Sequence, residues 1–209
     1  MSAFEFLEPT GAAAVARSPM EGRALAAGAR MELREGWNVA VAYDAGERER
    51  LESTVGWADV SHLTKLEVQR AADLEPGLAS RAHGAWWCRV TRDRVLVIGD
   101  AGVREHVDDA VDVTSALAAL TIAGPLAREV FARFCALDLR PQAMPLRGFR
   151  PGSVGRTPGY VVREDADRFL MLFGWALGEY MWTVVADAAE GLGGGPVGVD
   201  ALDREVARA

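Results

Sequence analysis

Four side chains that could serve acid-base or ligand-binding chemistry lie close together in the phrase DVSHLTKLEV: Asp59, Ser61, His62 and Lys65. An aspartate before a turn caps backbone N–H groups more often than it acts as a base, and a nearby serine can bond to neighbouring backbone groups. Lys65 differs because it is the only lysine of the chain. On a half-buried strand its ammonium could contact a carboxylate of a ligand or of a partner protein.

The phrase has a second copy, which points to the elements that position these residues. Asp59-Val60 precedes the strand candidate LTKLEV, and Asp112-Val113 precedes the strand candidate LAALTI. Each copy is followed by a hairpin with a charged turn, at residues 89–99 and 161–174, and then by a helix, at residues 103–110 and 176–190. The order strand, helix or loop, hairpin, helix, used twice, predicts a duplicated domain.

The predicted fold class is α+β, with two half-sheets related by a pseudo-twofold axis and antiparallel strands covered by helices. We expect a further strand at residues 37–43, a helix at residues 47–55 and a helix that begins at Pro125. Residues 1–30 read as an N-terminal arm, in which a capping box at Ser18 predicts a short helix. Residues 31–209 then form a single bilobed domain.

Composition excludes several classes of function. The net charge of −7 and the isoelectric point near 5.1 give no basic face for nucleic acid. The longest apolar run is far shorter than a bilayer requires, and the acidic N-terminus does not resemble a signal peptide, so we expect a soluble, cytoplasmic protein. The three histidines and two cysteines lack the spacing of metal ligands, so no metal site is predicted.

Tryptophan is abundant in this chain, and two tryptophans are adjacent. Trp86 and Trp87 point to opposite faces if they lie on a strand, because side chains alternate along it. One ring can then fill the core while the other meets solvent, a cavity or a partner.

The phrase GWADVSHLTKLEV resembles a signature of the glycine cleavage aminomethyltransferase (T-protein) and its folate-binding relatives, which runs like G-x-x-D-V-S-H-M-G-K-x-x-V. DVTSALAALTIAGPLAREV, GRTPGY and GGPVGVDAL resemble later segments of that family, in the same order. The resemblance spans roughly Glu35 to Leu202. It implies a duplicated, ferredoxin-like α+β region that binds folate.

Within this superfamily the chain looks more like the gamma subunit of heterotetrameric sarcosine oxidase. The resemblance lies in its length and in LDLRP, a Y-x-W on the last long helix and the segment GGGPVG. A C-terminal barrel domain follows in the aminomethyltransferases, and we expect none here.

The resemblance also locates the family's acids, and this chain departs from it there. Trp87 and Cys88 stand at the acidic positions of the first hairpin, and Leu170 stands where the family's pterin-binding glutamate aligns. A cleft that has lost these acids could not handle protons or hold a pterin, so no catalytic residue is assigned. The remaining folate-cleft candidates are Asp59, Ser61, His62, Lys65, Trp87, Arg156 and Leu170.

Three functions stay open at this point. The first is a non-catalytic accessory subunit that docks on larger flavin-bearing oxidase subunits, or on a second copy of itself, through exposed rings among Trp86, Trp87, Trp175 and Trp182. The second is a stand-alone enzyme that transfers one-carbon groups to tetrahydrofolate. The third is a small-molecule binding module that uses the former folate cleft, lined by Trp87 and Leu170, for a more hydrophobic ligand.

Overall fold

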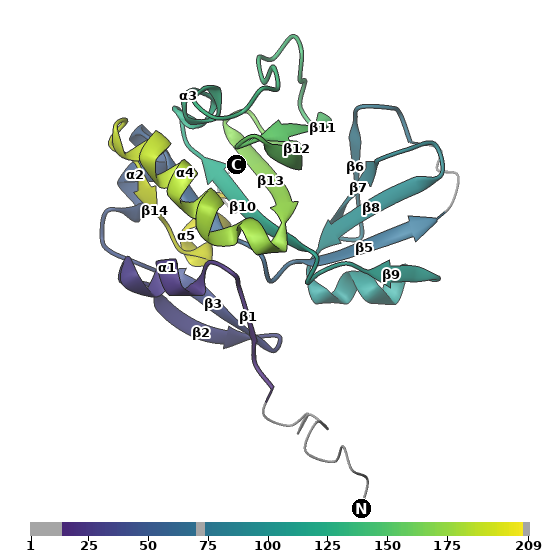
Figure 1. Ribbon diagram of the computed structural model, residues 1–209, viewed down its shortest axis with the longest axis horizontal. Coiled ribbons are helices and arrows are strands. Elements are labelled where there is room, and N and C mark those ends of the chain that lie inside the picture. The colour runs from purple at the N-terminus through teal and green to yellow at the C-terminus, as the bar shows by residue number, and fades with distance from the viewer. Residues whose placement is uncertain (1–13, 70–73, 207–209) are drawn as a thin grey trace, which may run out of the picture.

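The computed structural model describes residues 14–69 and 74–206, which form three β-sheets with helices packed around them (Figure 1). The strands are β1 Ala16–Arg17, β2 Arg30–Arg34, β3 Trp37–Ala42, β4 Gly56–Asp59, β5 Thr64–Gln69, β6 Ala79–Ala82, β7 Ala85–Arg89, β8 Arg94–Gly99, β9 Ala110–Asp112, β10 Leu117–Ala123, β11 Phe149–Val154, β12 Thr157–Asp165, β13 Arg168–Gly174 and β14 Gly195–Pro196. The α-helices are α1 Glu21–Ala26, α2 Glu47–Ser53, α3 Ala127–Ala132, α4 Gly178–Glu190 and α5 Val199–Val206, and the 3-10 helices are η3 Ala101–His106 and η4 Trp175–Leu177.

The two larger sheets carry most of the domain and are almost wholly antiparallel. One has six strands in the order β11-β12-β13-β10-β4-β14, and the other has five in the order β6-β7-β8-β5-β9. A small sheet, β1-β3-β2, lies beside them. Only the short strands β1 and β14 pair in parallel among the described residues. The predicted α+β class with antiparallel sheets is confirmed, as are the hairpins β7-β8 and β12-β13.

Both larger sheets contain the same run of strands. The sequence order β5, β6, β7, β8 becomes the sheet order β6-β7-β8-β5, and β10, β11, β12, β13 becomes β11-β12-β13-β10. The run in the five-stranded sheet is extended by β9, and the run in the six-stranded sheet by β4 and then β14. Strands β9 and β4 each come from the segment leading into the other sheet. A common origin of the two halves stays a prediction, but their connectivity is the same.

The repeated Asp-Val phrase marks the two places where the chain crosses between these sheets. Asp59 ends β4 in the six-stranded sheet and the chain continues into β5 of the other, while Asp112 ends β9 and the chain returns into β10. The Val60 N–H donates to the Ala119 carbonyl at 3.0 Å, and the Val113 N–H donates to the Lys65 carbonyl at 2.9 Å. Each crossing is therefore bonded to the strand that the other crossing begins.

Helix α4 covers one face of the six-stranded sheet, together with α3 (Figure 1). Its buried stripe contains Met181, Trp182, Val185 and Ala188, and Val184 lies at the edge of this stripe, only partly buried. The chain enters α4 through the 3-10 turn η4, and for this reason the α-helix begins later than the sequence predicts.

Packing against the core begins before residue 31, where the sequence suggested that an arm ends. Helix α1 confirms the short helix predicted at Ser18. Its residue Ala24, and Met20 directly before it, are buried in the core beneath α4. The described part of the predicted arm, residues 14–30, thus packs on the domain, and residues 1–13 lie outside the described residues. Apolar side chains at one-turn spacing make this segment pack rather than extend.

The C-terminal segment differs from the sequence prediction because it contains a helix. The sequence analysis predicts no helix after residue 190, but β14 is followed by α5, whose Val199, Ala201 and Leu202 are buried against β3 and β4. The helix starts at a very close approach of two backbones. The Gly198 N–H donates to the buried Glu47 carboxylate at 2.7 Å, and a Cβ on Gly198 would lie 2.0 Å from the Val41 carbonyl oxygen.

The close contact between the Gly198 and Val41 backbones yields a test of the fold. Gly198→Ala is expected to lower the free energy of unfolding by about 1–3 kcal/mol, because the added methyl must displace backbone. Gly22→Ala is the matched control: Gly22 lies on the exposed side of helix α1 and its Cβ would meet nothing within 4 Å. That variant should be neutral or gain about 0.5–1 kcal/mol, because alanine is the better helix former. Denaturant unfolding measures both, and equal effects would contradict this packing of α5.

Candidate functional site

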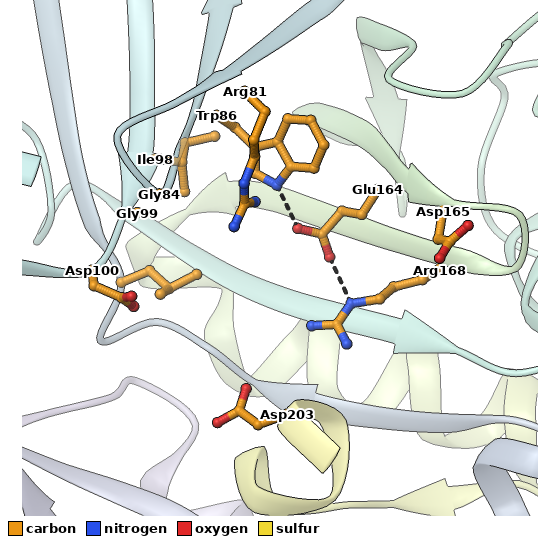
Figure 2. Close-up of a pocket in the computed structure, with 11 residues that line it drawn as sticks. Arg81, Gly84, Trp86, Ile98, Gly99, Asp100, Glu164, Asp165, Arg168 and Asp203 are labelled. Atoms are coloured by element: carbon orange, nitrogen blue, oxygen red, sulfur yellow. Dashed lines mark hydrogen bonds and ion pairs between the residues drawn. The ribbon is translucent and has the colours of Figure 1, made fainter. Parts of the chain in front are cut away.

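A concave site lies where the five-stranded sheet faces the β12-β13 hairpin and α5, and we call it the central cleft (Figure 2). Its volume is about 610 Å³, within the range of small-molecule sites. The lining residues are Leu63, Arg81, Gly84, Trp86, Ile98, Gly99, Asp100, Glu164, Asp165, Arg168 and Asp203.

A hydrogen-bonded group fixes the wall of the cleft and joins the two larger sheets. The Trp86 indole N–H, from β7, donates to Glu164 Oε1 at 2.7 Å, and Arg168 Nε, from β13, donates to Glu164 Oε2 at 3.0 Å (Figure 2). Arg168 Nη1 also donates to the Leu202 carbonyl of α5 at 3.1 Å. Glu164 thus has both carboxylate oxygens occupied, so its role is to orient Trp86 and Arg168.

The remaining cleft charges are mostly negative. Asp100, Asp165 and Asp203 line the cleft with Glu164, against the guanidinium groups of Arg81 and Arg168. Partial burial raises the pKa of the Asp203 carboxyl, Arg168 acts in the opposite direction, and the nearby carboxylates Asp200 and Asp100 raise that pKa further. Asp203 is therefore a carboxyl whose charge is poorly compensated by its surroundings.

The central cleft is lined by acids that the sequence analysis did not assign to a cleft, and they come from other positions than the family's acids. Asp100 follows β8, Glu164 and Asp165 lie at the end of β12, and Asp203 lies on α5. The sequence contains one signal for Glu164 and Asp165, the charged turn EDADR of the predicted hairpin at residues 161–174. Asp203 had no such signal, because its helix was not predicted.

Two of the predicted cleft residues face elsewhere. Trp87 lies on the opposite face of its strand, in a core with Leu66 and Val97, and its indole N–H donates to the Ala82 carbonyl at 3.2 Å. Leu170 is completely buried between the sheets. The prediction that the adjacent tryptophans face opposite ways is confirmed, but Trp86 is the ring that meets the cleft.

Arg156 also lies outside the central cleft. It occupies the tight turn between β11 and β12 with a φ of 61°, and it lines a separate hollow of about 730 Å³ with Leu117, Tyr160 and Phe173. This second hollow is mostly apolar. Arg156 therefore has no contact with the cleft that its family resemblance suggested.

The four residues of the opening phrase come together, but as an interior joint at the crossing rather than in the cleft. Asp59 Oδ1 accepts the Ser61 N–H at 2.9 Å, and Ser61 Oγ accepts the Ala119 N–H at 3.1 Å. Lys65 is fully buried and its Nζ donates to the Ser61 carbonyl at 2.6 Å. The interpretation of Asp59 as a turn cap and Ser61 as a backbone partner agrees with these bonds.

Burial makes this joint electrostatically unusual. Desolvation lowers the pKa of Lys65 to about 7, although the carboxylates of Asp59 and Asp112 act in the opposite direction. Desolvation, with the charges of Lys65 and Arg34, lowers the pKa of His62 to about 4. Desolvation also raises the pKa of Asp59, against hydrogen bonds from Ser18 and Ser61. No group of three or more His, Cys, Asp or Glu side chains among the described residues is arranged to hold a metal ion.

Comparison with known proteins gives a fold. Neither protein-family models nor curated proteins match the sequence. Among solved structures, a chain of heterotetrameric sarcosine oxidase from Corynebacterium sp. U-96, in complex with pyrrole 2-carboxylate, matches with a TM-score of 0.65 and 17% identity, over 85% of this chain and 96% of that one. Glycine cleavage system aminomethyltransferase T from Bartonella henselae matches with a TM-score of 0.73 and 14% identity, over 90% of this chain.

The chain has the fold of these two proteins. The T-protein-like fold that the resemblance implied is therefore confirmed. The chain spans 60% of the length of the aminomethyltransferase chain. In the part of the chain that the structure describes, no helix is both long and apolar enough to cross a membrane.

The Glu164 group yields a stability prediction for this T-protein-like fold. Glu164→Gln is expected to lower the free energy of unfolding by about 1–3 kcal/mol. The neutral glutamine amide cannot accept hydrogen bonds from both the Trp86 indole and the Arg168 guanidinium as the carboxylate does. Asp138→Asn makes the same chemical change in an ion pair with Arg140 whose side chains are 42% and 79% exposed, and it should lower stability clearly less than Glu164→Gln does. Equal losses in denaturant unfolding would show that Glu164 does not join the sheets.

Lys65 predicts a dependence of stability on pH. The unfolded lysine titrates near 10.5 and the folded one near 7, so the unfolded chain binds more protons between these values. The gain in folding stability from a neutral Lys65 is complete above pH 10.5 and is lost as the pH falls towards 7. Raising the pH from 7.5 to 8.5 should therefore increase the free energy of unfolding by about 1 kcal/mol.

The choice of this window separates Lys65 from other groups. The lowered pKa of His62 affects stability only below pH 6.5, and the raised pKa values of Cys88 and Cys135 affect stability only above about pH 9. Lys65→Met should flatten the profile measured by denaturant unfolding. A wild-type profile that is already flat from pH 7.5 to 8.5 would contradict a neutral, buried Lys65.

Proposed function

We propose that the chain is an accessory subunit, similar to the gamma subunit of heterotetrameric sarcosine oxidase, that docks on larger flavin-containing subunits in sarcosine or one-carbon metabolism. The fold shared with a chain from a heterotetrameric sarcosine oxidase supports this proposal. The observation that carries it is the residues at the family's acidic positions, Trp87, Cys88 and Leu170, which disfavour a stand-alone aminomethyltransferase.

The residues at the family's acidic positions support the same choice. Trp87, Cys88 and Leu170 are buried in cores and do not line the central cleft, so these positions contribute no acid to it. The carboxylates of the cleft come from other elements, and Glu164 is occupied by Trp86 and Arg168. The cleft is thus organised differently from the aminomethyltransferase pattern on which the resemblance rests.

The aromatic surface available for docking is smaller than the sequence suggested. Trp86, Trp87 and Trp182 are at most 9% exposed, and Trp182 packs edge to face on Trp57. Trp175 is only partly buried and meets the ring of Trp37 edge to face, with ring centres 5.9 Å apart. We assign this Trp37-Trp175 pair to the interface, because partly exposed tryptophans are typical anchors of protein interfaces.

Purification of the tagged full chain from its native source tests this function. The expected result is a stable complex with a larger flavin-containing protein that oxidises sarcosine. Trp175→Ala should reduce the recovered flavin by at least about tenfold, the effect of losing one anchor worth 1.4 kcal/mol or more. Leu146→Ala, at a side chain that is 55% exposed in another loop, is the control and should change nothing. A flavin-free monomer or homo-oligomer would overturn the proposal.

A further inference from the structure

We propose that the second hollow, beside Arg156, is a binding site for a small amphiphilic anion, a carboxylate carried on an apolar chain or ring. This site does not require the accessory role proposed above, and it shares no lining residue with the central cleft. Three features lead to this class of ligand: the apolar walls of the hollow, the unpaired guanidinium at its edge and the fixed turn that presents the guanidinium.

The walls of the hollow are largely apolar and belong to the six-stranded sheet and the turn that follows it. Strands β10, β12 and β13 and the 3-10 helix η4 contribute Leu117, Tyr160, Phe173 and Leu177. The Tyr160 ring is stacked on the buried Phe149 ring, with ring centres 5.6 Å apart, so this wall is held in place. The volume of about 730 Å³ is within the range of small-molecule sites, and such walls can bury the alkyl or aryl part of a ligand.

The charge of the hollow comes from one residue. Arg156 is the only charged side chain among the described residues that line the hollow, and it is exposed. Its guanidinium makes no hydrogen bond or ion pair with any described residue, so its N–H donors are open to a ligand. A guanidinium binds a carboxylate through two parallel hydrogen bonds, and no described Asp or Glu lines the hollow to compete for them. An anion is therefore attracted to this edge, whereas an ammonium is repelled.

The turn that carries Arg156 is tied to the rest of the domain. The Tyr180 hydroxyl donates to the Gly155 carbonyl at 2.9 Å, and the Gly155 N–H donates to the Phe134 carbonyl at 3.0 Å. Gly155 and Arg156 both have positive φ, of 54° and 61°, a conformation that normally takes glycine or asparagine in such a two-residue hairpin turn. The guanidinium thus extends from a fixed point at the edge of the hollow, which lowers the ordering cost of binding a ligand.

Titration of the full-length chain with sodium octanoate tests the proposal. At equal ionic strength, n-octylammonium chloride is the matched cation and sodium acetate is the anion without the apolar part. Isothermal titration and the thermal midpoint are measured together, because a ligand that binds the folded state raises the midpoint. We expect saturable binding of octanoate and binding of each control that is at least about tenfold weaker. Absence of octanoate binding, or equal binding of octanoate and either control, would overturn the inference.

Two arginine variants locate the site. Arg156→Gly should weaken octanoate binding by at least about tenfold, because it removes the charge partner of the carboxylate. This variant should fold at least as stably as the wild type, since glycine adopts a φ of 61° without strain. Arg147→Gly is the matched control: Arg147 is also exposed, has a φ of 60° and does not line the hollow, so binding should be unchanged.

Unchanged octanoate binding in Arg156→Gly, or an equal loss in both variants, would overturn the proposed site. The outcome is separate from that of the purification experiment. A chain that binds octanoate through Arg156 but recovers no flavin-containing partner would keep this inference and reject the accessory role.

Discussion

The two larger sheets are joined by two crossings, and each crossing depends on an aspartate-capped turn and one buried hydroxyl. Ser61 Oγ accepts the Ala119 N–H at 3.1 Å, and Thr114 Oγ1 accepts the Lys65 N–H at 3.0 Å. Each bond ties a crossing to the first residues of the strand that leaves the other crossing. A buried N–H without such a partner costs about 1–3 kcal/mol, so a change at one crossing is felt by both sheets. The central cleft lies between these sheets, and its shape follows from their fixed relation.

The same joint explains why a lysine can be buried here. Lys65 brings its amine to the Ser61 carbonyl at 2.6 Å, with the carboxylates of Asp59 and Asp112 near enough to influence its pKa. A permanently charged ammonium would be costly in this interior, and burial shifts the group towards its neutral form. The only lysine of the chain thus serves the connection between the sheets and does not reach the ligand carboxylate that its sequence position suggested.

The sequence predicts the elements of this fold better than the composition of its cleft. Alternating apolar residues and charged turns indicate both hairpins, and helical spacing indicates α4, because these patterns depend only on neighbours along the chain. The cleft depends on which face of each strand is covered. Alternation shows that Trp86 and Trp87 point apart, but only the packing of the second sheet decides that Trp86 meets Glu164. Asp203 could not be placed at all, since the glycine-rich segment before α5 gives no sequence pattern that predicts the helix carrying it.

Amide hydrogen exchange at the crossings tests most directly whether the two sheets form one body around a fixed cleft. The N–H groups of Val60 and Val113 should exchange only through global unfolding, with the same free energy as the centre of β10, because each is hydrogen-bonded to the opposite segment. Exchange of these two amides at the rate of an exposed loop, while β10 stays protected, would contradict the account and show that the sheets move independently.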